Sequence, residues 1–338
     1  MNFTWSEFLP LLFMGIMGLA LLVYAALDGY DLGVGLLLPL AEDDEKDLMV
    51  ASIGPFWDAN ETWLVLGIGV LLVAFPKAHG IILGALYLPV AFMLLGLILR
   101  GAAYDFRVKA KSDFKPLWNS AFAAGSAITA LAQGWMLGRY ITGFSEQFWT
   151  TLFCVGIALT LPAAYALLGS GWLIMKTEGR LQEKAVHWGQ KLLWPMGLML
   201  VGISLATPLV SETVRDKWLA LPQLIALLPI PLACLGAFWA IHHTLHRPRV
   251  VHAGYGWIVF VGTVLIFVLS FFGLAYSIYP NIVIDRLSIW QAASATESLA
   301  VIAIGVAVTL PIIIAYTVFM YRVFWGKAQA LSYDASER

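Results

Sequence analysis

The sequence predicts an all-α, polytopic membrane protein, and three observations indicate this class. Of its 338 residues, 60% are hydrophobic and only 12% are charged, whereas a soluble domain carries about a quarter charged residues. Apolar stretches long enough to cross a hydrocarbon core of ~30 Å recur from one end of the sequence to the other. The net charge of −1 provides no basic surface for nucleic acid, so we expect no nucleic-acid partner.

Hydropathy predicts about nine transmembrane helices joined by short connections. The helices are expected near residues 9–40, 53–75, 79–104, 117–139, 148–175, 190–210, 219–241, 254–278 and 297–324. The longest connections are expected at 105–116, 176–189 and 242–253, which leaves no room for an extramembrane domain. Residues 1–338 are therefore expected to form a single integral-membrane domain. Two four-helix bundles plus one peripheral helix would accommodate nine spans, although no internal repeat requires this division.

The distribution of basic residues predicts the orientation of the chain. With the N-terminus outside, the cytoplasmic segments hold 14 of the 20 Lys and Arg residues, the outer segments hold five, and Arg100 lies within a helix. The positive-inside rule therefore predicts the N-terminus outside and the C-terminus in the cytoplasm. Because the first basic residue is Lys46, the first helix lacks the charged region of a signal peptide and is expected to remain in the protein.

Four carboxylates and one guanidinium interrupt the first three predicted helices. Asp28 and Asp31 lie in the first helix, Asp58 and Glu61 in the second, and Arg100 in the third. With this orientation, helix geometry places all five in the cytoplasmic half, the acids roughly 7–18 Å from that end of the helices. Each acid pair has i,i+3 spacing and so projects from one helix face. We therefore expect a polar, hydrated pocket in this half of the membrane.

Two interpretations of this pocket remain open from the residues alone. In the structural one, Arg100 neutralises Asp31 or Asp58 and holds three helices together. In the functional one, the acids conduct protons or cations, a common role of carboxylates within membranes. One arginine cannot neutralise four acids, so some of them must be protonated, bound to a cation or in contact with water. This surplus of acid is the main functional signal in the residues themselves.

The histidines and cysteines give no sign of a metal or haem site in this chain. A haem-binding helix normally carries an axial ligand within the membrane, but all six histidines lie at predicted helix boundaries. His242 and His246 have the i,i+4 spacing of a metal pair, yet beside Arg247 and Arg249 they are better interpreted as a solvated helix end. Cys154 and Cys234 stand alone in apolar helices. We therefore expect no metal ligands in this chain.

Five segments together resemble subunit II of the cytochrome bd quinol oxidases. They are GYDLGVG (29–35), GPFWDANETWL (54–64), LRGAAYDFR (99–107), GWLIMKTEG (171–179) and YRVFWGK (321–327). The resemblance extends over essentially the whole chain, including its length and predicted topology. No single motif is decisive, but five in the same order are specific.

The resemblance implies a quinol:O₂ oxidoreductase of a bacterial respiratory chain, located in the cytoplasmic (inner) membrane. In that family, subunit I oxidises quinol and ligates two haems b and one haem d, where O₂ is reduced to water. Subunit II packs against subunit I, walls the haem region and contributes to cytoplasmic proton access; a small single-helix subunit, lipid and quinone are further partners to expect. By motif position, Asp58 is the first candidate for proton access and Trp57 for a place beside the haem region. Asp28, Asp31, Glu61 and Arg100 are second candidates, with Arg100 forming a structural ion pair.

Two alternatives belong to different functional classes. An ion-coupled secondary transporter would also explain an acidic cluster, but it predicts internal repeats and paired broken helices, and the sequence shows no matching pair. A purely structural assembly subunit differs from the oxidase interpretation only in whether the acids matter to turnover. A reduced-minus-oxidised haem spectrum of the native complex would separate the oxidase from the transporter.

Overall fold

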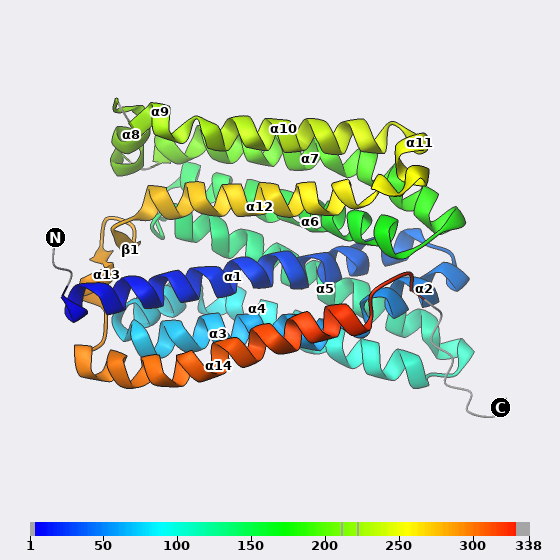
Figure 1. The fold of residues 1–338 in the computed structure, drawn as a ribbon, viewed down its shortest axis with the longest axis horizontal. Helices are drawn as coiled ribbons and strands as arrows, with labels where there is room; N and C mark the ends of the chain where they lie inside the picture. The colour runs from blue at the N-terminus through cyan, green and yellow to red at the C-terminus, as the bar shows by residue number, and fades with distance from the viewer. Residues whose placement is uncertain (1–3, 211, 222, 329–338) are drawn as a thin grey trace.

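The structure, a computed structural model, describes residues 4–210, 212–221 and 223–328. Nine long helices dominate the described residues and run roughly parallel to one another (Figure 1). They are α1 (Trp5–Leu37), α3 (Trp57–Ala74), α4 (Pro76–Lys109), α5 (Lys115–Ile141), α6 (Phe148–Lys176), α7 (Gly179–Val210), α10 (Pro229–Leu245), α12 (Trp257–Ile278) and α14 (Thr296–Val323). Helices suit this sequence because they satisfy every backbone polar group within one segment, as the bilayer core requires.

Short elements connect the long helices at both ends of the molecule. They are η1 (Leu38–Leu40), α2 (Asp43–Ile53), η2 (Ser112–Phe114), α8 (Glu212–Leu219), α9 (Gln223–Leu227), α11 (Pro248–Val250), the π-helical turn η3 (Val251–Tyr255), β1 (Asn281–Val283), β2 (Leu287–Ser288) and α13 (Ile289–Ala292). The two strands form an antiparallel hairpin, with Asn281 opposite Ser288 and Val283 opposite Leu287.

Eight stretches of the described residues are both long and apolar enough to cross a membrane: seven correspond to single long helices, and one is α10 together with α9 (Leu224–Leu245). The ninth long helix, α5, has 27 residues and so spans about 40 Å, but it carries more polar side chains. It packs between α4 and α6 and also contacts α1, so protein covers much of its surface. The prediction of about nine membrane helices is thus confirmed, with α5 as the span that depends on its neighbours for cover.

The helices form two groups of four with α14 at the side. The first group consists of α1, α3, α4 and α5, in which α1 and α4 each pack against both α3 and α5. The second group consists of α6, α7, α10 and α12, in which α6 and α10 each pack against both α7 and α12. Helix α1 joins the groups by packing along α6. A Cβ on Gly33 would lie 1.8 Å from the Tyr165 carbonyl oxygen, so only glycine allows this close approach of α1 to α6.

Several predicted boundaries differ from the structure, and charged residues explain most of the differences. Helix α4 continues to Lys109 and α7 begins at Gly179, so the expected connections at 105–116 and 176–189 are largely helical. Their charged turns form ion pairs with α2, which the sequence analysis had left as part of a loop: Lys184 contacts Glu45, and Arg107 contacts Asp47. The span expected at 219–241 lies at Leu224–Leu245, where α9 and α10 together form the apolar stretch. Two further connections between long helices are long, 38–56 between α1 and α3 and 279–295 between α12 and α14.

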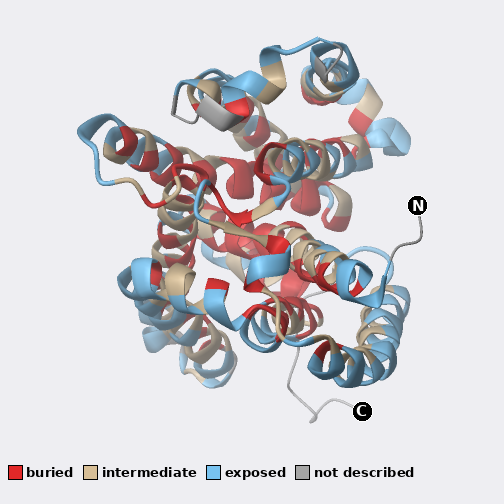
Figure 2. Ribbon diagram, turned by 90° about the vertical axis from the view of Figure 1, so that its left-hand side faces the viewer, coloured by how far each residue is buried: buried red, intermediate tan, exposed pale blue. Residues whose placement is uncertain are grey.

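Burial is concentrated at the centre of the molecule, where α1 and α6 meet (Figure 2). By contrast, only 6% of the most apolar window of α14 and 17% of that of α4 is buried. Helix α1 begins and α14 ends at opposite ends of the bundle (Figure 1), as an odd number of crossings requires. Which end faces the cytoplasm stays a prediction from the basic residues.

Candidate functional site

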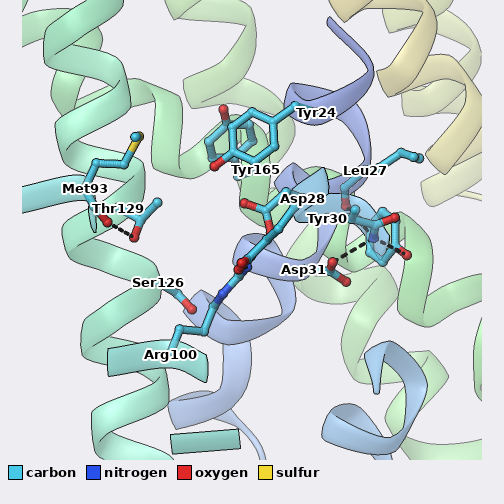
Figure 3. Close-up of polar contacts among 12 residues, drawn as sticks. Tyr24, Leu27, Asp28, Tyr30, Asp31, Met93, Arg100, Ser126, Thr129 and Tyr165 are labelled. Carbon is cyan, nitrogen blue, oxygen red and sulfur yellow. Dashed lines mark hydrogen bonds and ion pairs between the residues drawn. The ribbon is translucent and has the colours of Figure 1, made fainter. Parts of the chain in front are cut away.

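The site is centred on Arg100, which three helix packings place in the protein interior. Arg100 lies on α4 and is 1% exposed. A Cβ on Gly125 of α5 would lie 2.9 Å from the Arg100 backbone nitrogen, so glycine lets α5 pack directly against this turn of α4. The Arg100 side chain then extends toward Asp28 on α1 (Figure 3). Three helices therefore fix the position of the guanidinium.

Arg100 forms ion pairs with two carboxylates. Its Nη2 donates to Asp28 Oδ1 over 2.5 Å and to Glu61 Oε1. Asp28 is fully buried, whereas 27% of the Glu61 side chain is exposed. The expectation that Arg100 would pair with Asp31 or Asp58 is wrong: Asp31 is hydrogen-bonded to a different group, and Asp58 points to the surface. The ion pair nevertheless joins α1, α3 and α4.

Asp31 belongs to a second hydrogen-bond network, whose other members are neutral side chains. Asn60 Nδ2 on α3 donates to Asp31 Oδ2 over 2.8 Å and to the Tyr30 hydroxyl over 3.0 Å. The Tyr30 and Tyr321 hydroxyls lie 2.6 Å apart, and Tyr321 donates to Asn60 Oδ1 over 3.2 Å. This network ties α1 and α3 to α14. Tyr321 also lines a mostly apolar surface groove between α1 and α14.

Several buried polar atoms of the site have no hydrogen-bond partner. They are Asp28 Oδ2, Asp31 Oδ1, and Arg100 Nε and Nη1. Three acids thus surround one arginine here. Buried polar atoms left without partners are costly, so protonation of an acid or ordered water must satisfy these groups. The arrangement is chemically suited to holding protons and water inside the bundle.

Asp58 and Trp57 lie at the edge of this cluster rather than inside it. Asp58 is exposed on α3, and it forms no hydrogen bond or ion pair with the described residues. Trp57 is half-buried and packs against Tyr104, with ring centroids 5.4 Å apart. The sequence predicts all four acids in one pocket. The structure brings together Asp28, Asp31, Glu61 and Arg100, with Asp58 on the surface.

Neutral polar residues extend the site, and the sequence analysis missed them. Gln133 on α5 donates to the Tyr24 hydroxyl over 2.8 Å and accepts from the Tyr165 hydroxyl over 2.6 Å. Tyr24 and Tyr165 lie next to Asp28 (Figure 3). Asn60 was missed in the same way. The sequence did contain a signal for these residues. An uncharged polar side chain within an apolar helix, like a charged one, requires a hydrogen-bond partner inside the protein.

The histidines do not suit the axial ligation of a haem within the membrane. His79 lies in the first turn of α4, His187 in the first turns of α7, and His242, His243 and His246 at the end of α10. Among the described residues, no group of three or more His, Cys, Asp or Glu side chains is arranged to hold a metal ion. That the haems are bound by another subunit stays a prediction.

Comparisons with known proteins agree on one family. A family model described as "Cytochrome bd terminal oxidase subunit II" matches residues 9–324. Cytochrome bd ubiquinol oxidase subunit 2 of Bacillus subtilis (strain 168) is 27% identical over 341 residues, covering 95% of this chain and 94% of the relative. Cytochrome bd-I ubiquinol oxidase subunit 2 of Escherichia coli (strain K12) is 24% identical over 367 residues, covering 92% and 93%.

A solved structure shares the fold. A chain of the bd oxidase from Geobacillus thermodenitrificans superposes with a TM-score of 0.75 at 16% identity, covering 94% of this chain and 99% of that one. The family and the apolar spans together make this a multi-pass protein of a bacterial inner membrane. Because the family model extends over nearly the whole sequence, the chain belongs to the cytochrome bd terminal oxidase subunit II family.

Proposed function

We propose that this chain is the subunit of a quinol:O₂ oxidoreductase that covers the haem-bearing subunit I and gives protons access to it from the cytoplasm. The relatives named above are subunits of ubiquinol oxidases, and membership of their family favours this function over an ion-coupled transporter. The haems b and d and the quinol site would belong to subunit I. The placement of the histidines at helix ends supports this division.

The observation that carries the proposal is a graded series of acids from the surface inward. Asp58 is exposed, the Glu61 side chain is 27% exposed, and the Asp28 side chain is fully buried. Arg100 bridges the last two. An ionisable group exposed at membrane depth costs at least ~2.5 kcal/mol unless protein or water covers it. At the depth predicted for it, Asp58 would therefore need a polar environment that the described residues of this chain do not supply.

Subunit I would supply that environment. The helices α3, α4 and α14 lie on one side of the molecule (Figure 1), and the apolar windows of α4 and α14 are largely unburied. We propose that this face packs against subunit I, with Trp57 and Asp58 at the contact. Reduction of O₂ to water consumes protons, and a carboxylate at the contact can pass them between water in this chain and the partner.

Replacement of Asp58 tests the proposal. Asp58→Asn keeps the shape of the side chain but cannot exchange a proton. We expect quinol oxidase turnover of the purified complex to fall severalfold, with a solvent isotope effect on the slowed step. Haem content and reduction of haem b by quinol should stay near normal, because these need no proton delivered to O₂.

The control is Asp44→Asn, an exposed acid in α2. Asp44 is a better control than Asp43, because Asp43 is paired with Lys46. The hydrogen bond from Lys46 and its charge lower the pKa of Asp43, so replacing Asp43 would also break an ion pair. Asp44→Asn should leave turnover unchanged. Normal turnover of Asp58→Asn with full haem content would refute a role in proton access. Loss of assembly in Asp58→Asn would instead point to a structural role at the contact.

A further inference from the structure

A corner of the surface carries basic residues that the proposed oxidase function does not use. It extends from the last turn of α10 through α11 and η3 to the first turn of α12. Within it His246, Arg247, Arg249 and His252 are exposed, and His243 is half-buried. We call these five residues the basic corner. Residues 217–284, which include it, contain neither Asp nor Glu.

Exposed aromatic side chains border the basic corner. Trp194 and Trp239 are 61% and 65% exposed, and Tyr255 and Trp257 are 53% and 47% exposed. The Trp239 ring lies over His243, with centroids 5.1 Å apart. Exposed tryptophans and tyrosines of membrane helices lie at the level of the lipid headgroups. These four side chains therefore place the basic corner at that level.

Stabilisation of the helix end explains the histidines but not the arginines. Cations at a helix C-terminus compensate its dipole, and the His246 Nδ1 lies 2.9 Å from the His242 carbonyl oxygen. Arg247 and Arg249 lie beyond the end of α10, and neither forms an ion pair with a carboxylate of the described residues. Their guanidinium groups are thus available to a ligand.

The backbone of the corner is held firmly enough to form a site. Gln190 on α7 donates to the Leu245 carbonyl oxygen over 2.7 Å and so fixes the end of α10. Val250 N donates to the Arg247 carbonyl oxygen over 2.8 Å, which closes the turn carrying both arginines. On the membrane side, α7 and α10 expose apolar side chains, including Leu198 (70%) and Leu235 (64%). Acyl chains could lie along this surface.

We infer that the basic corner binds the headgroup of an anionic phospholipid. Arg247 and Arg249 pair with its phosphate, the bordering tryptophans contact the glycerol region, and the acyl chains lie along α7 and α10. Basic sites at the ends of transmembrane helices are suited to such headgroups, and each arginine near an anionic surface strengthens binding by about fivefold. A small free anion would contact only the arginines, whereas a phospholipid also contacts the aromatic side chains that border them. We therefore assign the site to a lipid.

Lipid titrations of the purified oxidase complex test this inference. Native mass spectrometry would measure the fraction carrying tetraoleoyl cardiolipin, with phosphatidylethanolamine as the zwitterionic comparison. Arg247→Gln/Arg249→Gln should weaken cardiolipin binding by roughly 25-fold, at about fivefold per arginine, and leave phosphatidylethanolamine unchanged. The control is Lys109→Gln/Lys111→Gln, which makes the same change in charge at exposed positions of the same end of the molecule. Arg247→Lys/Arg249→Lys should keep most of the binding, which separates lost charge from damaged structure.

Four results would overturn the inference. One is unchanged cardiolipin binding by Arg247→Gln/Arg249→Gln, and another is an equal loss in the Lys109/Lys111 control. Displacement of cardiolipin by millimolar inorganic phosphate would assign the corner to small anions instead. A photoreactive residue at position 247 that cross-links to a protein subunit in intact membranes, and not to lipid, would also refute it.

Discussion

Lys176 donates a hydrogen bond to the carbonyl oxygen of Phe324 over 2.8 Å, and so joins the end of α6 to the end of α14. Two further bonds reinforce the junction: Ala328 N donates to the Lys176 carbonyl oxygen over 2.7 Å, and Lys327 Nζ to that of Thr177 over 3.0 Å. The segments 171–179 and 321–327, which contributed to the family resemblance, are therefore in contact. They fasten one end of the helix that is least buried in this chain.

Lys176→Met should loosen the end of α14. The Lys176 ammonium lies 5.2 Å from the centre of the Phe56 ring and 5.1 Å from that of Trp172, and the residue is only 8% exposed. Methionine can fill this aromatic site but cannot donate to Phe324, at a cost of about 1.5–3 kcal/mol for a charged hydrogen bond. We expect faster proteolysis after Val323 and a lower melting temperature of the complex. Lys191→Met, at an exposed position of α7, should change neither; equal effects of both variants would contradict this prediction.

Arg100→Leu should prevent assembly of the complex. It would leave Asp28 and Glu61 without their cation, and breaking a buried pair costs ~3–5 kcal/mol. Haem spectra of membranes would measure the amount of assembled oxidase. Arg100→Leu combined with Asp28→Asn should recover part of it, because one stranded charge is removed. Wild-type amounts of intact oxidase in the single variant would show that the ion pair does not hold the helices together.

The sequence was sufficient to predict the membrane spans, because hydrophobic length alone determines where a helix can cross. It failed where charge extends a helix beyond the membrane. The first turns of α7 are polar, so the span predicted from hydropathy begins near residue 190, whereas α7 begins at Gly179 and pairing of Lys184 with Glu45 stabilises these turns. Likewise, α2 is too polar to be found by hydropathy. The sequence signal for this helix is the capping box that Glu42 and Glu45 form at its start.

The sequence predicted that acids of the first two long helices lie near Arg100, but it did not predict which of them pair with it. Spacing along α3 placed Asp58 and Glu61 on one face, and helix rise placed both near Arg100. Which of them reaches Arg100 depends on the rotation of α3 against α1, and Asn60 helps to set this rotation through its bond to Asp31. An i,i+3 pair also spans about 60° of the helix surface. That angle is enough to put Glu61 on Arg100 and Asp58 outside.

Replacement of the histidines tests where the haems are bound. All six histidines lie at or near helix ends, whereas a haem-binding helix normally carries its axial ligand within the membrane. We therefore expect His→Gln at each position to leave every haem band of the purified complex in place, as measured by reduced-minus-oxidised spectra. Loss of a single haem signal in one variant, with the complex otherwise intact, would assign a haem ligand to this chain.

Asp31→Asn and Asn60→Leu should have opposite consequences for stability. The Asp31 Oδ2 atom accepts from Asn60, while its Oδ1 has no partner. In Asp31→Asn an amide oxygen can accept the same bond, and a buried group that repels Asp28 is removed. The melting temperature of the purified complex should therefore be unchanged or higher. Asn60→Leu instead leaves Asp31 without its donor and removes the acceptor of the Tyr321 hydroxyl, and we expect about 1–3 kcal/mol of destabilisation. If both variants lose similar stability, Asp31 is held as a charge and not as a neutral acceptor. If Asp31→Asn keeps its stability but loses turnover, Asp31 takes part in proton access.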